Sequence, residues 1–267
     1  MKALLDGDVL VYACGFSCES AVYTLYYDDK KLNTFESKKE IDKFADGLVS
    51  GYNYDASLFV VDKHINIPPL SHVLHVVKAK IEFVLERTQA TDYEIYLTGK
   101  NNFRDTCSPD LDKYKGNRDR DLKPYHYEDI KSYLINVWDA KVVDGIEADD
   151  ALGLAQNDDS IICTVDKDLN QIPGLHFNWD KDIIYTVSVE EGIRYYYYQM
   201  LKGDTTDNIK GVPGIGEKRA LAIVEENELV DLPQLVEAKY IEAFGDKGIE
   251  IMNQTDKLIK IKMDLDD

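Results

Sequence analysis

The sequence is short of the residues that bind soft metals, and it lacks the apolar runs that cross membranes. It has 4 cysteines and 5 histidines among 267 residues, and no cysteines are spaced as Cys-x-x-Cys. A zinc site is therefore not expected. No apolar run approaches the ~18 residues of a membrane helix. The start, MKALLDGDVLVYACG, is interrupted by Asp6 and Asp8 and is a poor signal peptide. We expect a soluble, cytoplasmic, monomeric chain without a membrane partner.

Basic residues are also few. The chain has 31 lysines and arginines against 50 acids, for a formal net charge of −19. Taken alone, this balance argues against a nucleic-acid binder, because phosphate contacts need lysine and arginine. The exceptions are local: seven bases gather between residues 100 and 124, and Lys218 and Arg219 are adjacent.

Short apolar runs alternate with helical periodicity along most of the chain. They predict strands at 2–6, 57–61, 93–97, 141–144, 160–165, 175–179 and 183–187, a hairpin at 22–36, and helices at 37–50, 69–88, 127–138 and 147–155. This order predicts an α/β fold with a mostly parallel central sheet flanked by helices. After residue 187 the strands stop, and Ser188 and Glu191 form a capping box. We predict a core domain at 1–187 and a helical subdomain at 188–267.

Four carboxylates crowd into seven positions, 144–150, of the segment VDGIEADDALGLA: Asp144, Glu147, Asp149 and Asp150. One or two acids in a first helical turn are ordinary, because they face the positive end of the helix dipole. At about 100° per residue, however, Glu147 and Asp150 share a face with the apolar residues, while Asp149 points elsewhere. Unpaired buried carboxylates are costly, and a hard divalent cation such as Mg²⁺ relieves that cost.

Other predicted strands deliver acids to the same place. Asp6 follows the first strand, and Asp166 and Asp168 follow the strand at 160–165, two positions apart, so that an extended chain points both to one side. A single acid there is usually a cap, as we expect for Asp8. Because the carboxyl ends of parallel strands share one edge, we expect a common cluster that binds more than one divalent ion.

A second constellation lies in LKGDTTDNIKGVPGIGEKRA, residues 201–220. Asp204 and Asp207 are followed by a glycine-rich turn and then by Lys218 and Arg219. The plain interpretation is a helix cap and an ordinary loop. The functional one is the turn of a helix-hairpin-helix, whose backbone amides bind phosphate.

The segment 100–124 mixes seven bases with five acids and has little apolar periodicity. Such segments are usually solvated loops. The functional alternative is a mobile element over the carboxylates, with Lys115 and Arg118 reaching a phosphate.

The stretches LLDGD, YKGNRD, IEADDALG, TVDKDLNQIPG and KGDTTDNIKGVPGIGEKRA occur in the order seen in the 5′-nuclease superfamily. That family includes the bacteriophage 5′–3′ exonucleases, the flap endonucleases and the 5′-nuclease domain of bacterial DNA polymerase I. The resemblance covers roughly residues 1–225. It implies a PIN-like core, a helical subdomain with a helix–three-turn–helix DNA-binding motif, and metal-dependent hydrolysis of DNA from 5′ ends, flaps or nicks.

Residue roles follow from the resemblance. Two Mg²⁺ ions, with Mn²⁺ as a substitute, are implied at a carboxylate cluster made of Asp6, Glu147, Asp149, Asp150, Asp166, Asp168, Asp204 and Asp207. Lys115 and Arg118 resemble the bases that polarise the scissile phosphate. The segment 100–124 resembles the arch through which a 5′ strand passes. DNA contacts are expected from Arg104, Tyr114 (by stacking), Gly211, Gly214, Gly216, Lys218 and Arg219, with K⁺ at the GVPGIG turn.

One position departs from the family pattern. Thr98 stands where an aspartate is expected after the strand at 93–97, so Asp8 or Asp105 is a candidate substitute. Two alternatives stay open: a PIN-type ribonuclease, and a DNA-binding accessory protein with a degenerate site. Activity on RNA–DNA hybrids is a further open point.

Overall fold

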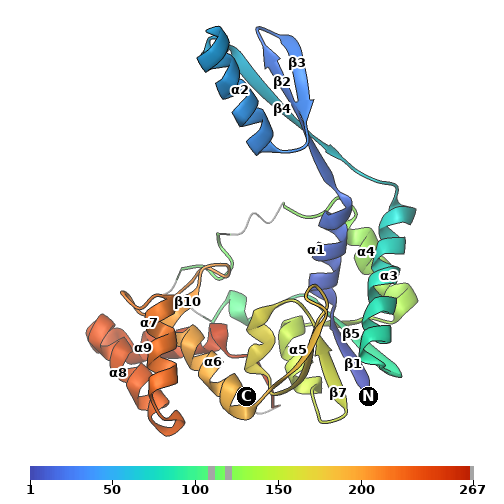
Figure 1. Cartoon of the computed structure of the whole chain (residues 1–267). Coiled ribbons are helices and arrows are strands. Elements are labelled where there is room, and N and C mark those ends of the chain that lie inside the picture. Colours follow the sequence, from blue (N-terminus) through green and yellow to red (C-terminus); the bar gives the residue numbers. More distant parts are fainter. Residues whose placement is uncertain (108–111, 118–121, 265–267) are drawn as a thin grey trace.

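The computed structural model describes residues 1–107, 112–117 and 122–264 (Figure 1). Arg118, one of the two bases expected to contact phosphate, lies outside the described residues. No helix in the described ranges is long and apolar enough to cross a membrane.

A six-stranded sheet forms the centre of the molecule, in the order β6-β5-β1-β7-β8-β9. The first five strands are parallel, and β9 is antiparallel to β8. The strands are β1 (Lys2–Asp6), β5 (Asp92–Thr98), β6 (Lys141–Val143), β7 (Ser160–Cys163), β8 (Gly174–Asn178) and β9 (Ile183–Val187). The predicted α/β fold with a mostly parallel sheet is confirmed.

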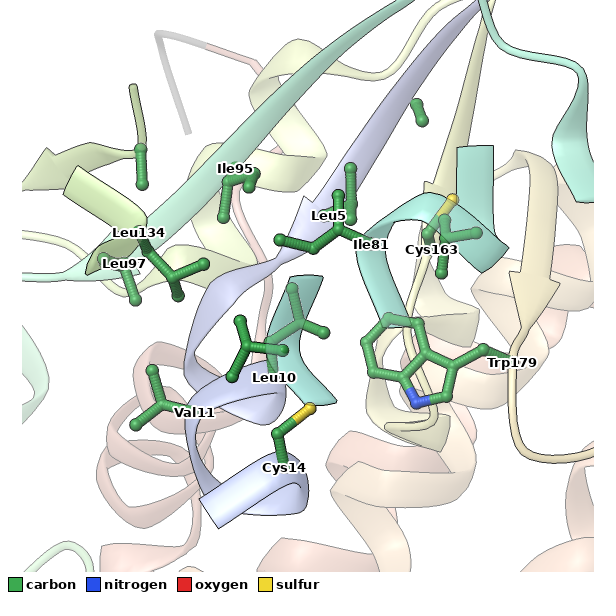
Figure 2. Packing of buried hydrophobic residues seen from close by; sticks show 14 of the residues in the cluster. Leu5, Leu10, Val11, Cys14, Ile81, Ile95, Leu97, Leu134, Cys163 and Trp179 are labelled. Atoms are coloured by element: carbon green, nitrogen blue, oxygen red, sulfur yellow. The ribbon is translucent and has the colours of Figure 1, made fainter. Parts of the chain in front are cut away.

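Helices cover both faces of this sheet because its central strand is apolar on both sides. Ala3 and Leu5 face one core, and Leu4 between them faces another, as the alternation of a strand requires. The first core is covered by α1 (Gly7–Cys18), α3 (Leu70–Thr88) and α4 (Tyr127–Trp138), and the second by α5 (Ala148–Ala155). Figure 2 shows Leu10, Val11 and Cys14 of α1 beneath the strands.

The segment between α1 and α3 forms a separate module that projects from the body (Figure 1). It contains β2 (Ser20–Tyr27), β3 (Lys30–Phe35), α2 (Lys38–Tyr52), the 3₁₀ turn η1 (Ala56–Leu58) and β4 (Phe59–Asn66). The strands pair antiparallel in the order β3-β2-β4. The expectation of a buried strand at 57–61 is therefore wrong. Val60 and Val61 are 56% and 46% exposed, because β4 is the edge of a small sheet instead of a strand of the central one.

The chain after β9 is mainly helical, as predicted. It contains α6 (Val189–Lys202), a short hairpin of β10 (Gly203–Asp204) and β11 (Ile209–Lys210), α7 (Glu217–Glu226), η4 (Leu229–Asp231), α8 (Leu232–Phe244), η5 (Gly245–Lys247) and α9 (Gly248–Ile259). The capping box of Ser188 and Glu191 begins α6 as expected. These elements enclose a core of their own, which includes Leu201, Leu232 and Tyr240. The division at residue 187 stays a prediction.

Candidate active site

Asp6 ends β1 inside the protein, at the carboxyl edge of the sheet. Its side chain is 1% exposed, caps α1 by accepting the Val9 N–H at 3.0 Å, and accepts the Thr164 hydroxyl at 2.9 Å. Burial raises the pKa of Asp6 from its ordinary 3.8 to about 7, and the neighbouring charges of Asp8 and Asp166 add to the shift. A carboxyl group held this way is poised to exchange its proton for a cation.

Asp149 lies in the first turn of α5 and faces the same edge. Burial raises the pKa of Asp149 well above the ordinary range. The negative charges of Asp6, Glu147 and Asp166 raise it further. The helical wheel turned Asp149 away from the predicted cluster and turned Asp150 toward it. The structure reverses these positions, because Asp149 lines the cavity and lies near Asp6, whereas Asp150 is paired with Arg104.

Asp166 and Asp168 are brought together by a 3₁₀ turn, η3 (Lys167–Gln171), rather than by the extended chain that the spacing suggested. Asp166 caps this turn by accepting the Asp168 N–H at 2.9 Å. Asp168 accepts hydrogen bonds from Gln199 Nε2 at 2.9 Å and from the Tyr195 hydroxyl at 3.3 Å. Burial raises the pKa of Asp168 to about 8, and the charge of Asp166 and the hydrogen bond with Asp204 add to the shift. Asp168 is therefore the member of the Asp168–Asp204 pair that carries the proton.

Glu147 and Asp207 are joined by two consecutive residues of the predicted arch. Lys115 Nζ lies 2.6 Å from Glu147 Oε1 and 3.7 Å from Asp207 Oδ2. The Tyr114 hydroxyl lies 2.8 Å from Glu147 Oε2 and 3.0 Å from Asp207 Oδ2. Tyr114 is only 4% exposed, so its ring has no open face for the stacking role that we expected.

Arg104 and Asp150 form a buried ion pair beside the cavity. Their side chains are 2% and 0% exposed, and two parallel hydrogen bonds of 2.5 and 2.8 Å join them. Asp150 also accepts the N–H groups of Glu147 and Lys262. Burial opposes ionisation of Asp150, but the hydrogen bonds and charge of Arg104 outweigh it and lower its pKa. Arg104 therefore has no surface for DNA, contrary to expectation, and Asp150 is engaged by Arg104 instead of the other carboxylates.

The glycine-rich turn divides into a packed part and an open part. A Cβ atom on Gly211 would lie 2.2 Å from the Lys202 carbonyl carbon, so Gly211 is needed where the hairpin crosses α6. Gly214, with φ of +77°, and Gly216, which precedes α7, have no atom within 4 Å of such a Cβ. Lys218 and Arg219 are exposed in the first turn of α7. The open part thus leaves backbone and bases accessible to a phosphate.

Thr98, at the position where the family pattern has an aspartate, has a structural role. Its hydroxyl accepts the Ala148 N–H at 2.9 Å, at the start of α5. The carboxylate of Asp8 accepts the Thr98 N–H at 3.1 Å, whereas Asp105 lies in a separate turn, η2 (Phe103–Asp105). Of the two candidate substitutes, Asp8 therefore lies at the end of β5. Our expectation that Asp8 caps α1 is wrong, since Asp6 does so.

The acids surround a small cavity of about 30 Å³, which is room for about two water-sized groups. Its walls are Arg104, Tyr114, Glu147, Asp149, Asp168, Gln199, Asp204, Asp207, Ile209, Leu258, Ile259 and Ile261. Within the described ranges, no three acid, histidine or cysteine side chains converge closely enough to hold one ion as they stand. The Lys115 ammonium and the raised pKa of Asp168 offset only part of the negative charge of these acids. The donors are nevertheless carboxylate oxygens, which suit a hard divalent cation. A bound cation would take the place of the Lys115 ammonium and of the proton on Asp168.

The raised pKa values predict how stability depends on pH and metal. A carboxyl whose folded pKa exceeds its unfolded value stabilises the fold below the unfolded pKa, and this contribution is lost as the pH rises through the folded pKa. For Asp6 and Asp168 the loss falls between about pH 4 and 8, from the ordinary pKa of 3.8 to the folded values of about 7 and about 8. In EDTA, we expect the melting temperature to fall over this range. Mn²⁺ should raise it more at pH 8.5 than at pH 5.5, and NaCl of equal ionic strength should not. A flat profile in EDTA would contradict this account.

Sequence comparisons agree with the motifs. The chain is 30% identical over 114 residues to the exodeoxyribonuclease of Enterobacteria phage T3, and 33% and 31% identical over 97 and 153 residues to DNA polymerase I of Pseudomonas aeruginosa and of Caldicellulosiruptor bescii. The alignments cover 39%, 31% and 46% of this chain but only 38%, 11% and 17% of those proteins. No family model matches. The chain resembles the 5′-nuclease family over these segments.

Solved structures with a similar arrangement come from bacteriophage T5. The T5 D15 protein co-crystallised with metal ions has a TM-score of 0.49 and 16% identity, with 97% of this chain and 99% of that chain covered. A variant of the T5 D15 flap endonuclease in a complex with DNA and metal ions has a TM-score of 0.47 and 17% identity, with 97% and 98% covered.

Some residues that shape the site could not be predicted from the sequence. Gln199 and Tyr195 hold Asp168, and Thr164 holds Asp6. The cavity is closed by Leu258, Ile259 and Ile261 from the C-terminal region, where the sequence shows no motif. Neutral side chains and backbone groups carry no spacing signal of their own, so only the folded structure reveals them.

Proposed function

We propose that this chain is a metal-dependent 5′ nuclease that hydrolyses DNA phosphodiesters at 5′ ends or flaps and leaves 5′-phosphates. The observation that carries the proposal is the meeting of acids from four separate segments. Asp6 from β1, Asp149 from α5, Asp168 from η3 and Asp204 from the β10–β11 hairpin lie around or beside one cavity. Asp6, Asp149 and Asp168 all have raised pKa values, which is the signature of a site that lacks enough positive charge.

We assign the ions, two Mg²⁺ or Mn²⁺, to the acids of this cluster: Asp6, Glu147, Asp149, Asp166, Asp168, Asp204 and Asp207. Asp8 is an added candidate at the end of β5. Bound ions of this kind lower the pKa of a water molecule and stabilise charge on phosphoryl oxygens. Asp150 we assign to the frame of the site, since Arg104 engages it.

Lys115 is the base that we assign to the scissile phosphate. Its ammonium group lies between Glu147 and Asp207, and the backbone is fixed there by the 2.8 Å hydrogen bond from the Lys115 N–H to the Asp207 carbonyl. An ammonium held beside the acids contributes a point charge to a phosphate oxygen. The matching role of Arg118 rests on the YKGNR motif.

Duplex DNA is proposed to bind at the open part of the GVPGIG turn. Gly214 and Gly216 leave the backbone accessible, and Lys218 and Arg219 are exposed beside it. We propose that this turn is part of a helix–three-turn–helix motif with a K⁺ site. Residues 188–267 are proposed as the DNA-binding subdomain. The segment 100–124 is proposed as the arch over a PIN-like core. With a net charge of −19, we expect non-specific DNA binding to be weak and sensitive to salt.

The main rival is a PIN-type ribonuclease, which would share the acidic sheet edge. The glycine turn with its adjacent bases favours DNA, because a ribonuclease of that type gives no reason for it. A DNA-binding accessory protein without activity is the second rival. The acids with raised pKa values around the cavity argue against it, since a site without activity has no need to keep them together.

Cleavage of an end-labelled 5′-flap duplex in Mg²⁺ or Mn²⁺ tests the proposal. We expect short 5′ products from DNA, a 5′-phosphate on the remaining strand, and no products in EDTA. The matched control is the same flap made of RNA, together with a single-stranded RNA of the same sequence. Faster cleavage of the RNA substrates would favour the ribonuclease, and binding without any cleavage in Mn²⁺ would favour the accessory protein.

A further inference from the structure

The last described part of the chain crosses the floor of the cavity. We call Leu258–Lys262 the C-terminal strap. It consists of the last two residues of α9, Leu258 and Ile259, and of the three residues that follow and continue beside α5. Leu258, Ile259 and Ile261 are 4%, 6% and 4% exposed, and all three line the cavity. Ile259 belongs to the core of the helical region, whereas Ile261 belongs to the core under α5. The strap therefore joins the two cores at the site.

Alternate residues of the strap bind the Arg104–Asp150 pair. Arg104 donates through Nε to the Leu258 carbonyl at 3.0 Å and through Nη2 to the Lys260 carbonyl at 2.7 Å. The Lys262 N–H donates to Asp150 Oδ1 at 3.0 Å. Arg104 also lies 3.4 Å from Glu147, so these bonds connect the strap with one wall of the cavity.

The intervening residues bind a glutamine on the other side. Gln171 Nε2 donates to the Ile259 carbonyl at 2.9 Å, and Gln171 Oε1 accepts the Ile261 N–H at 3.2 Å. The same Nε2 lies 2.6 Å from Gln199 Oε1. Gln199 in turn donates to Asp168 at 2.9 Å. The strap is thus connected through two neutral side chains to an acid of the opposite wall.

Leu258 and Ile259 end α9, and from Lys260 the backbone is extended, so that side-chain groups bind the strap on two sides. The fit along the strap is close. A Cβ on Gly153 of α5 would lie 2.2 Å from the Lys262 carbonyl oxygen, so the strap runs directly against the α5 backbone. Gln171 and Gln199 are 2% and 5% exposed, and buried polar groups of this kind hold one arrangement when all are satisfied.

We propose that the C-terminal strap is a positioning element for the metal-binding acids. It fixes Glu147 through Arg104 and fixes Asp168 through Gln171 and Gln199, so that both walls of the cavity keep their relative placement. The inference rests on the proposed function, because it concerns the affinity of the acids for a divalent cation. Groups that orient ligands from behind typically contribute a factor of about 10–100 in metal affinity.

The first test replaces Gln171 by leucine, which is of similar size but forms no hydrogen bonds. We expect Gln171→Leu to weaken Mn²⁺ binding by about 10-fold or more in calorimetric titration. The matched control is Gln156→Leu. Gln156 also has two side-chain hydrogen bonds, to Leu175 and Ser160, but it lies at the end of α5 remote from the site. The control should bind Mn²⁺ as the wild type does, although it loses comparable contacts.

A second pair of variants tests the backbone of the strap, in case the loss of Gln171 prevents folding. Lys262→Pro removes the N–H that Asp150 accepts, whereas Lys262→Ala removes the side chain and keeps that N–H. We expect the proline variant to bind Mn²⁺ more weakly than the alanine variant. Melting temperatures in EDTA show whether each variant is folded.

The outcomes separate the two proposals. If the wild-type chain binds no Mn²⁺, the proposed function fails. If the wild type binds it and both Gln171→Leu and Lys262→Pro, when folded, bind it equally well, the strap is only a structural connection and this inference is overturned. Weaker binding by those two variants, with binding retained by Gln156→Leu and Lys262→Ala, supports the positioning role.

Discussion

Replacing Asp149 by asparagine is expected to lower the cleavage rate of 5′-flap DNA by roughly 10²–10³-fold. Asp149 lines the cavity, and the charges of Asp6, Glu147 and Asp166 act on it. An asparagine keeps the size of the side chain but removes the negative oxygen that a divalent ion needs. Losing one group that stabilises charge in the transition state costs about 3–4 kcal/mol, which corresponds to that change in rate.

The same substitution should stabilise the chain when metal is absent. Since the pKa of Asp149 is raised well above the ordinary range, its ionised form destabilises the fold at pH 8, and asparagine has no charge to repel. We expect Asp149→Asn to melt higher than the wild type in EDTA at pH 8 and to gain less from Mn²⁺. A protein that loses activity while it gains stability has lost a functional group and not its fold.

Asp158→Asn is the matched control for both measurements, because Asp158 is exposed in the turn before β7. It should change neither the cleavage rate nor the response to Mn²⁺. Unchanged turnover in Asp149→Asn would remove Asp149 from the site. Equal melting temperatures of Asp149→Asn and the wild type in EDTA would show that no repulsion acts on this side chain.

Arg104→Ala is expected to produce the largest loss of stability, about 3–5 kcal/mol in the free energy of unfolding at pH 7. The substitution leaves Asp150, which is fully buried, without its two charged hydrogen bonds. It also removes the donors to Leu258 and Lys260. Folded domains are stable by only about 5–15 kcal/mol, so this loss is a large fraction of the total. Urea denaturation in EDTA measures it.

Arg87→Ala provides the comparison, because Arg87 is half exposed and pairs with Asp182 at 2.6 Å. The two arginine–aspartate pairs have similar distances and differ in burial. We expect the surface variant to unfold at nearly the same urea concentration as the wild type. Similar losses in the two variants would show that burial does not determine the contribution of the Arg104–Asp150 pair.

The pH dependence adds a second check on Arg104. In the wild type the pKa of Asp150 is lowered, so the pair stabilises the fold above the ordinary pKa of aspartate, and the contribution is lost on acidification. In Arg104→Ala the buried carboxyl should instead hold its proton, so the deficit should grow as the pH rises from 4 to 8. Adding Asp150→Asn to this variant removes the unpaired charge and should recover part of the lost stability.

Much of the fold could be predicted because local patterns and tertiary contacts agree. Strands β1, β5 and β7, helices α3 and α4, and the capped start of α6 lie close to their predicted positions. The module at 20–66 is the exception. Its apolar run SLFVV has the same composition as a buried strand, and a run of that length does not reveal which sheet it joins. Pairing with β2 decided that, through contacts far apart in the sequence.

For the site, the predicted acids at the ends of β1 and β7 and at the start of α5 do meet at one edge of the sheet. Their individual roles were harder to predict. The helical wheel exchanged Asp149 and Asp150, because an ideal helix carries no information on the angle at which α5 crosses the sheet. Arg104 and Tyr114 were expected at the DNA surface and are buried, since basic and aromatic residues in a polar segment resemble a binding loop whether or not they fold inward.

The amino-acid sequence by itself determined the alternation that builds a parallel sheet and the features on which the proposed chemistry rests, which are acids after successive strands and a glycine turn with adjacent bases. These are local features, with short spacing and strong side-chain chemistry. Only the tertiary structure decided which acids face the cavity, which arginine neutralises Asp150, and that the C-terminal strap closes the floor. Those contacts join residues up to 156 positions apart through backbone and neutral amide groups, and such groups leave no pattern in a sequence.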